Sequence, residues 1–446
     1  MEKEEISLQS KISQTVESFL EKTKDKETLV ISHFDADGIS SAAILITALN
    51  RADRKFSVKV IKSLEKKFIM DLPKDKVIIF LDLASGSTDY MVEAGLQDVF
   101  IIDHHEITKH VPEEIEMINP QLHNKEKISS SSLTYLFCKE INSENKDLAK
   151  TAIIGMIGDR MDQDISQLNN KILEEGKIKR KRGLIIYPAT RPINRVLEYS
   201  SQPFIPGVTG DIKGVLELLR EVGLKSANGK YKNIADLTEE EMEKIVTAIS
   251  LRTQQINSQN LVGDIFLIKQ FNKLEDAREL CAKVNACSRS GNSELAIQFL
   301  MGVKKIKKKA EFIHNKYKQA LVSGLKIASN LKNEEGKGFV IINAQDQIKD
   351  TMIGTIASII SGSTLYQEGT MIIAMAYYDD KIKISSRNSG REKGRNVREI
   401  LDVVIKKIGG EVGGHEFAAG GIIKQEQEKD FITSIKKHLE IELVKI

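Results

Sequence analysis

Short clusters of acidic and histidine residues follow apolar runs in the first part of the chain. Three of these runs have the length of one buried strand each, namely TLVIS (28–32), VIIFL (77–81) and VFII (99–102). Between them the apolar residues have helical spacing, as in Ile39–Leu49. Strands that alternate with helices are typical of βαβ units, so this pattern predicts an α/β fold built on a parallel sheet.

The polar residues after these runs are of types that bind metal ions. HFDADG (33–38) follows the first run, Asp82 the second and Asp103-His104-His105 the third, while Gly158-Asp159-Arg160 ends a further apolar segment. A lone Asp in such a place is usually a turn or cap residue. Because ligand sites of open parallel sheets form at the carboxyl ends of the strands, four such segments predict one shared site.

The charge of this predicted site indicates its ligand. Carboxylates at close range repel one another and become protonated unless cations balance them. A mixed Asp and His set suits Mn²⁺, with Mg²⁺ as the alternative. The set also holds enough ligands for two cations that share one bridging carboxylate. We therefore expect two divalent cations, Mn²⁺ before Mg²⁺, at this edge of the sheet.

The length of the chain and its few cysteines limit the classes of protein to which it can belong. A chain of 446 residues is too long for one core and predicts two or three domains. The sequence has no apolar run near the roughly 18 residues of a membrane span, and its N-terminus lacks the apolar core of a signal peptide. We expect a cytoplasmic protein with no membrane partner. Cys138, Cys281 and Cys287 lack zinc-ligand spacing and are interpreted as buried core residues.

Basic residues gather in three blocks although the formal net charge is only +3. The blocks are KIKRKR (177–182), KKIKKK (304–309) and a group of five between Arg387 and Arg398. Any one block reads equally well as solvated surface. Three in one chain favour a polyanionic partner. The sequence has no Trp and few aromatic residues, so stacking of bases on aromatic rings is not a prominent feature.

The combination of motifs resembles the DHH phosphoesterase family. HFDADG, LDLAS, IIDHH and IGDRMD resemble its four motifs, and GGHEFAAGG (413–421) resembles the signature of the DHH-associated domain. VNACSRSG (284–291) and the stretch from Thr190 to Gly210 resemble the RecJ-type nucleases in their archaeal form. Ser288 stands where that motif usually has glycine, and Lys283 where arginine is common. The resemblance spans both ends of the chain.

The resemblance implies an α/β fold class with a parallel-sheet DHH domain, a helical insertion, a long connecting helix and a smaller α/β DHH-associated C-terminal domain. The catalytic domain would cover 1–195 and be completed by about 275–302. The helical insertion would cover 196–274, the connecting helix 303–330 and the DHH-associated, substrate-binding domain 331–446.

The resemblance also implies a role for each motif residue. One metal would be held by His33, Asp35 and Asp82. The other would be held by Asp37, Asp82, His104 and Asp159, so that Asp82 bridges. Two residues are catalytic candidates: His105, which would orient the site or contact the phosphate, and Asp103, which would orient a histidine. The substrate-binding candidates are Asn285, Arg289, Ser386, Arg387, Gly413, Gly414 and His415. Without the resemblance, the glycine-rich run reads as a plain turn or as an anion-binding nest of backbone N–H groups.

The expected function is that of a metal-dependent exonuclease for single-stranded DNA or RNA in replication or repair. One alternative is a replication-fork scaffold that binds the GINS complex and the replicative helicase through the insertion. Another is a phosphodiesterase for small oligonucleotides or cyclic dinucleotides. The complete set of expected ligands favours an enzyme over a scaffold, and the insertion and basic blocks argue against small substrates. The polarity of digestion, the choice between DNA and RNA, and the oligomeric state stay open.

Overall fold

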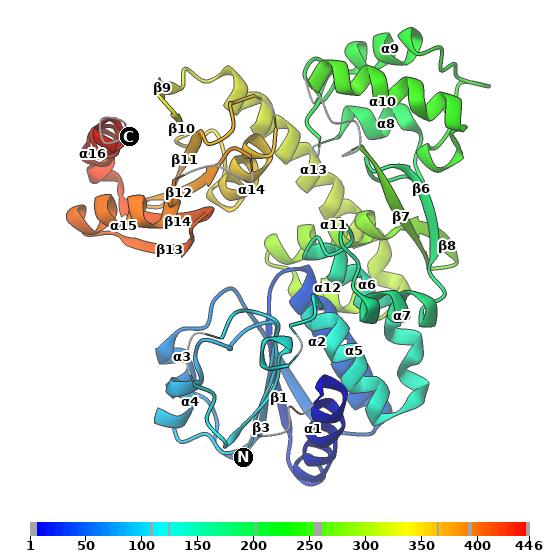
Figure 1. Cartoon of the computed structure of the whole chain (residues 1–446), viewed down its shortest axis with the longest axis vertical. Helices are drawn as coiled ribbons and strands as arrows, with labels where there is room; N and C mark the ends of the chain where they lie inside the picture. Colours follow the sequence, from blue (N-terminus) through cyan, green and yellow to red (C-terminus); the bar gives the residue numbers. More distant parts are fainter. Residues whose placement is uncertain are drawn as a thin grey trace. The chain divides into compact units, whose positions relative to one another are not determined.

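The computed structural model of the protein describes residues 7–107, 110–123, 125–200, 203–253, 261–363, 365–390 and 395–442, without the side chains of residues 415, 441 and 442. The chain forms two compact units (Figure 1). Unit 1 consists of Met1–Gly183 and Gly263–Asn315, and unit 2 of Leu184–Val262 and Lys316–Ile446. Among the described helices, none has the length and hydropathy that a membrane span requires.

A five-stranded sheet in the order β2-β1-β3-β4-β5 forms the centre of unit 1. All four of its strand pairs are parallel, which confirms the predicted parallel sheet. Its strands are β1 Thr28–His33, β2 Phe56–Ile61, β3 Val77–Leu81, β4 Val99–Ile102 and β5 Ile115–Ile118. Strands β3 and β4 are buried along their whole length, as their unbroken apolar runs predict.

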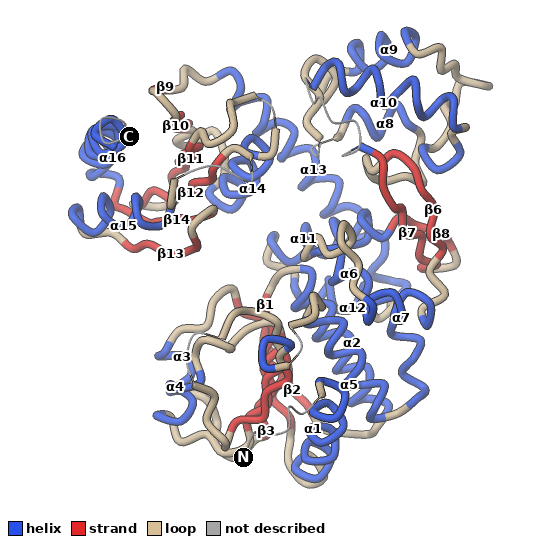
Figure 2. The backbone as a smooth tube through the Cα atoms, viewed as in Figure 1, coloured by secondary structure: helices blue, strands red, loops and turns tan. Residues whose placement is uncertain are grey.

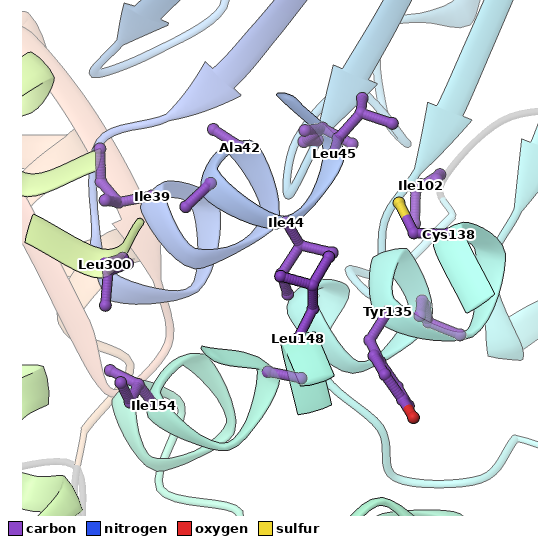
Figure 3. Packing of buried hydrophobic residues seen from close by; sticks show 14 of the residues in the cluster. Ile39, Ala42, Ile44, Leu45, Ile102, Tyr135, Cys138, Leu148, Ile154 and Leu300 are labelled. Atoms are coloured by element: carbon purple, nitrogen blue, oxygen red, sulfur yellow. The ribbon is translucent and has the colours of Figure 1, made fainter. Parts of the chain in front are cut away.

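Helix α2 (Ala36–Arg51) is the buried helix of unit 1, because small and apolar residues surround its axis. It packs against helices α5, α6 and α12, and Figure 3 shows side chains from these elements meeting in one cluster. All three cysteines are buried, as expected. The helices of this unit are α1 Leu8–Lys22, α2, α3 Lys66–Met70, α4 Thr88–Glu93, α5 Ser130–Ile141, α6 Ala149–Gly158, α7 Gln167–Glu175, α11 Ala277–Arg289, α12 Ser293–Leu300 and the start of α13 Lys307–Asn330.

A second, three-stranded sheet lies in the order β6-β7-β8 and was not expected from the sequence. Its strands are β6 Lys179–Leu184, β7 Val262–Gln270 and β8 Lys273–Asp276. The first four residues of β6 are the basic side chains Lys179, Arg180, Lys181 and Arg182, and all four are exposed. An unbroken run of charges has no apolar alternation, so the pattern that identifies a strand is missing here.

The 184–262 segment of unit 2 is mainly helical, with α8 Ile193–Glu198, α9 Ile212–Glu221 and α10 Glu239–Thr253. A capping box begins α10: Glu241 N donates to Thr238 Oγ1 at 3.2 Å and Thr238 N donates to Glu241 Oε2 at 2.9 Å. The first residue of α8 follows Pro192, a residue type that suits a helix start.

The C-terminal part of unit 2 contains a six-stranded sheet in the order β13-β14-β12-β11-β10-β9 (Figure 2). Alternate residues of β11 face opposite layers: Met371 and Ile373 pack with α15 and α16, whereas Ile372 and Ala374 pack with α13 and α14. The elements are β9 Glu334–Gly336, β10 Phe339–Asn343, α14 Asp350–Ser361, β11 Met371–Tyr378, β12 Lys381–Asn388, α15 Val397–Ile408, β13 Glu411–His415, β14 Ala418–Lys424 and α16 Glu428–Glu442.

The glycine-rich run near the C-terminus is a β-hairpin and not a plain turn between a strand and a helix. Strands β13 and β14 pair antiparallel, with Gly414 opposite Ala419. A Cβ on Gly414 would lie 2.5 Å from the carbonyl oxygen of Ala418, and its φ of 125° is open mainly to glycine. The glycines therefore allow close backbone approach inside the hairpin.

Candidate metal centre

Carboxylate and imidazole groups converge at the carboxyl ends of β1, β3 and β4 and at the C-terminal end of α6. One group contains His33, Asp35 and Asp82, and its ligand atoms lie within 4.8 Å of one another. A second group meets the same limit and contains Asp37, Asp82, His104 and Asp159. A third contains Asp82, His104 and His105. Asp82 belongs to all three groups, which is the arrangement that a bridging carboxylate requires.

The loop after β1 turns sharply into α2 and points its side chains at this edge. Asp35 is the N-cap of α2, and its Oδ1 accepts a hydrogen bond from Gly38 N at 3.1 Å. A Cβ on Gly38 would lie 2.3 Å from the carbonyl oxygen of His33, so only glycine fits there. The turn therefore brings His33, Asp35 and Asp37 to one side of the helix start.

Asp82 itself has an unusual backbone conformation. Its φ is 61°, and Ala84 follows with a φ of 92°. Left-handed conformations cost energy in residues other than glycine and are concentrated at functional sites. Asp82 is only 2 % exposed, and within the described residues its Oδ1 accepts no hydrogen bond. His104 Nε2 lies 3.5 Å from that oxygen. A buried carboxylate oxygen without a hydrogen bond is costly, so the site fits a ligand that supplies positive charge.

Asp37 is held by the N-terminus of α5. Its Oδ2 accepts a hydrogen bond from Ser130 N at 2.7 Å and its Oδ1 accepts one from Ser131 N at 3.1 Å. The positive end of the helix dipole favours a carboxylate at this position. Gly155 of α6 lies against the same carboxylate, because a Cβ there would be 2.4 Å from Asp37 Oδ1. Ser130, Ser131 and Gly155 belong to none of the motifs found in the sequence, although a run of four serines before an apolar helix is a recognisable N-cap signal.

The histidines of the site lie between carboxylates. His33 Nδ1 lies 3.2 Å from Asp35 Oδ2 and 3.3 Å from Asp82 Oδ2. Burial disfavours its charged form, but the hydrogen bonds to Asp35 and then Asp82 outweigh burial and raise the pKa of His33 to about 10. His104 Nε2 lies 3.1 Å from Asp159 Oδ2, and the same balance raises the pKa of His104 to about 11.

The buried carboxylates show the opposite effect. Burial, followed by the negative charge of Asp159, raises the pKa of Asp37 to about 7. Burial, followed by the charge of Asp37, raises the pKa of Asp82 to about 6. These directions mean that protons on imidazoles and carboxylates would balance the charge in the protein alone. The donor set of aspartates and histidines fits divalent cations of the Mn²⁺ type, which would take over that balance.

Asp103 lies behind the metal-ligand groups and fixes the orientation of His105. Asp103 Oδ1 lies 2.6 Å from His105 Nδ1, and it accepts a backbone hydrogen bond from His104 N at 2.8 Å. Its Oδ2 accepts hydrogen bonds from Ser85 N at 3.1 Å and from Ser85 Oγ at 2.6 Å. Burial raises the pKa of Asp103, but its hydrogen bonds and nearby charges outweigh burial. The hydrogen bond with His105 contributes most, and the pKa of Asp103 lies below its usual value.

Helix α11 packs against the loop that carries the first ligands. The Ser288 hydroxyl donates to the backbone carbonyl of Phe34, the residue between His33 and Asp35, and lies 3.1 Å from Ser293 Oγ. Asn285 is on the same helix, with its Nδ2 3.7 Å from Cys281 Sγ. Arg289 is the last residue of the helix. Ser288 looked from the sequence like a departure from a motif, and the structure gives its hydroxyl a definite partner.

The remaining substrate candidates are in the C-terminal sheet of unit 2. Ser386 is buried and its hydroxyl donates to Ile372 O at 2.9 Å, while Arg387 Nη1 donates to Ser386 O at 2.7 Å. Arg387 of β12 and His415 of β13 are the two strand neighbours of Ala418 of β14. Gly413 and Gly414 are exposed on β13. The His415 side chain, and Arg391 and Lys393 of the third basic block, lie outside the described parts.

Three domain families match the chain in sequence. The DHH family, N-terminal domain, matches residues 27–157; the DHH-CID domain matches residues 187–261; and the DHHA1 domain matches residues 336–440. An uncharacterized protein of Methanocaldococcus jannaschii is 26% identical over 427 residues, which cover 91% of each chain.

Solved structures share the fold at low sequence identity. Exonuclease RecJ bound to manganese has a TM-score of 0.61 at 16% identity, covering 97% of this chain and 94% of that chain. RecJ from Thermus thermophilus in complex with Mn²⁺ has a TM-score of 0.60 at 16% identity, covering 97% of this chain and 54% of that chain. CDC45 from Entamoeba histolytica has a TM-score of 0.70 at 12% identity, covering 96% and 98%. With its DHH, DHH-CID and DHHA1 domains in this order, the chain belongs to the DHH family and has a RecJ-like fold.

Proposed function

We propose that the protein is a metal-dependent exonuclease that hydrolyses phosphodiester bonds of single-stranded nucleic acid in DNA replication or repair. The observation that carries this proposal is the position of Asp82, which belongs to every ligand group of the centre and has a buried oxygen that accepts no hydrogen bond among the described residues. A structure of similar fold is that of an exonuclease bound to manganese, which supports the same chemistry here.

The ligand groups suggest how the residues would be divided between two cations. His33, Asp35 and Asp82 would hold one cation, and Asp37, Asp82, His104 and Asp159 would hold the other. When bound, two Mn²⁺ or Mg²⁺ ions would lower the pKa of a water molecule and offset the charge that builds on the phosphate.

The neighbouring residues would keep these groups in place. The N-terminus of α5 holds Asp37 through Ser130 N and Ser131 N. Asp103 engages Nδ1 of His105, so Nε2 is the nitrogen that His105 would present to a phosphate oxygen. Ligands fixed by such contacts need little reorganisation when substrate binds, which is the basis of electrostatic preorganisation.

The substrate strand would be held by residues outside the ligand groups. Arg387, Ser386, Gly413, Gly414 and His415 belong to neighbouring strands of the DHHA1 domain. The guanidinium of Arg387 is oriented by the carbonyl groups of Ser386 and Ala419, at 2.7 and 3.3 Å, and by Ser358 Oγ at 3.2 Å. A fixed guanidinium loses little entropy when it binds a phosphate. In unit 1, Asn285 and Arg289 would help to position the strand from α11.

The direct test is digestion of matched single-stranded DNA and RNA, labelled at either end, with Mn²⁺ or Mg²⁺ present. Stepwise shortening of at least one strand is expected, and the labelled end that is lost first gives the polarity. Folded protein that cleaves cyclic dinucleotides but neither strand would replace the exonuclease with the small-substrate phosphodiesterase. Folded protein that cleaves none of them with either ion would contradict the enzyme.

A second function, compatible with the first, is binding of a replication protein such as the GINS complex by the helical insertion. The observation that favours it is apolar exposure: Ile212 and Leu216, one turn apart on α9, are 42% and 39% exposed, and Leu251 on α10 is 73% exposed. An amphipathic helix with apolar residues on its outer face is suited to docking against another protein.

Replacement of residues 187–261 by a short Gly/Ser linker tests this second function. Ile185 N donates to Leu261 O at 2.9 Å, so a short linker can join the two ends. Strands β7 and β8 stay, because they belong to the sheet that contains β6. Loss of GINS or helicase pull-down with nuclease activity retained would support the module. Unchanged pull-down, or loss of activity alone, would indicate a structural spacer.

A further inference from the structure

Two basic blocks that are far apart in the sequence are both anchored on the small sheet of unit 1. The first is β6, where Lys179, Arg180, Lys181 and Arg182 are all exposed. The second begins at Lys304 and continues into the first turn of α13, where Lys304, Lys305, Lys308 and Lys309 are exposed. Sequence alone gives no reason for these blocks to be neighbours.

Contacts with the two other strands place both blocks. Arg180 of β6 forms an ion pair with Asp264 of β7. Lys307 Nζ lies 4.0 Å from Glu275 Oε1 of β8 and 5.3 Å from the ring centre of Phe271, in the turn between β7 and β8.

The register of the sheet gives the separation between these two contacts. Glu275 pairs with Ile268 on β7, so the two blocks are anchored at positions 264 and 268 of the same strand. Four residues of a strand span about 14 Å, and the step from β6 to β8 is about 10 Å. The two anchoring contacts therefore lie about 17 Å apart on one sheet. The exposed basic side chains of the two blocks are together called the basic ribbon.

The acidic side chains of this sheet neutralise only part of the ribbon. Asp264 is engaged by Arg180, Glu275 Oε2 lies 2.6 Å from the buried Lys283, and Asp276 lies 2.8 Å from Arg278. Charges on β6 alone could be explained by protection of a sheet edge against aggregation, for which one or two lysines suffice. That explanation does not cover the second block, because it lies on a helix start and not on an edge strand.

We propose that the basic ribbon binds the phosphate backbone of single-stranded nucleic acid outside the metal centre, so that it holds the part of a long substrate that is not being cleaved. The proposal extends the nuclease function proposed above and rests on it. Contacts of this kind read charge and not sequence, and they weaken as salt concentration rises.

The test compares two full-length variants that each lose four positive charges. The ribbon variant carries Lys179→Ala, Arg182→Ala, Lys305→Ala and Lys308→Ala. The control variant carries the same change at exposed lysines before the first three strands of the large sheet, at the edge opposite the metal centre, namely Lys24, Lys26, Lys55 and Lys74. Fluorescence anisotropy in EDTA would measure the affinity for a 5-nucleotide and a 30-nucleotide DNA strand at several salt concentrations.

The ribbon variant should bind the 30-nucleotide strand about 10- to 100-fold more weakly at 0.1 M salt, with a salt slope lower by about 0.7 for each phosphate that the variant no longer neutralises. Binding and Mn²⁺-dependent cleavage of the 5-nucleotide strand should not change, and the control should match the unmodified protein. A variant with arginine in place of Lys179, Lys305 and Lys308 should keep the affinity for the long strand. Since the substituted side chains are exposed, thermal unfolding of the ribbon variant should be unchanged. That of the control should change little, because Lys26 loses only a surface ion pair with Asp98.

Each other outcome has a definite meaning. The ribbon proposal would be wrong if the ribbon variant bound the long strand as tightly as the unmodified protein, or if the control lost as much affinity. Cleavage of the short strand would still support the nuclease. A different result is salt-dependent binding of the long strand by the unmodified protein, loss of that binding in the ribbon variant, and no cleavage of any strand. This result would contradict the nuclease function and support the ribbon. Binding of poly-glutamate but of no nucleic acid would identify an acidic protein partner and overturn the proposal.

Discussion

Substitution of Gly155 by alanine tests how the second ligand group is built. Gly155 is on α6, outside every motif, and its Cα faces the carboxylate of Asp37. An added Cβ would lie 2.4 Å from Asp37 Oδ1 and 2.2 Å from Ser131 Oγ. Real Cβ atoms are essentially never closer than 3.0 Å to another heavy atom. Because Asp37 and Ser131 are both fully buried, neither can move into solvent to relieve the overlap.

The size of the effect follows from these distances. The carboxylate must retreat by about 0.6 Å to reach the 3.0 Å limit and by about 1 Å to reach ordinary contact, which weakens its 2.7 Å hydrogen bond from Ser130 N. Overpacking costs about 1–3 kcal/mol, and the better helix propensity of alanine returns up to about 1 kcal/mol. The fold should therefore survive, but Mn²⁺ affinity should fall by about 10- to 100-fold, as when residues that orient metal ligands are changed.

Mn²⁺ titration by calorimetry, combined with thermal unfolding in EDTA, separates the two effects. Gly324→Ala is the matched control, since its Cβ would lie 2.6 Å from Ile356 Cδ1 on the DHHA1 side of α13. That variant should lose some stability and keep Mn²⁺ affinity. If Gly155→Ala bound Mn²⁺ as tightly as the unmodified protein, the contact between Gly155 and Asp37 would have no part in shaping the centre.

Four further substitutions separate the roles of the site residues. Asp82→Ala should lower nuclease activity by at least about three orders of magnitude, because it removes the proposed bridge; near-normal activity with unchanged metal content would contradict the assignment. Ser288→Ala should weaken Mn²⁺ binding without unfolding the protein, because it removes the hydroxyl that holds the Phe34 carbonyl, and unchanged calorimetric affinity would show that this contact is not needed. Arg387→Ala should weaken binding of single strands and lower the salt slope by about one unit. Elemental analysis should find full metal content in Arg387→Ala and in His415→Ala, and an emptied site in either would show that these residues bind metal.

The fold class and the ligand types could be predicted from the sequence because both depend on local patterns. Apolar runs of four or five residues with helical segments between them predict parallel strands. In such a sheet the carboxyl ends meet at one edge, so Asp82 and Asp103 can be placed near His33 without any knowledge of distances. In the structure, Asp82 lies within the ligand groups and Asp103 lies behind them. The strand pattern does not predict this difference, because both residues directly follow a buried strand.

The precise support of the site was decided by tertiary structure. Ser130 contacts Asp37 across 93 residues, and Ser288 contacts Phe34 across 254 residues. Which helix end meets which carboxylate depends on how α5, α6 and α11 pack against α2, and no local spacing encodes that packing. The same holds for β6: its charges give a basic block in sequence, and only pairing with β7 makes it part of a sheet that also carries the second block. Local periodicity determines which elements form and where their polar ends lie, whereas the choice of contacts between distant elements depends on the shape and burial of the whole core.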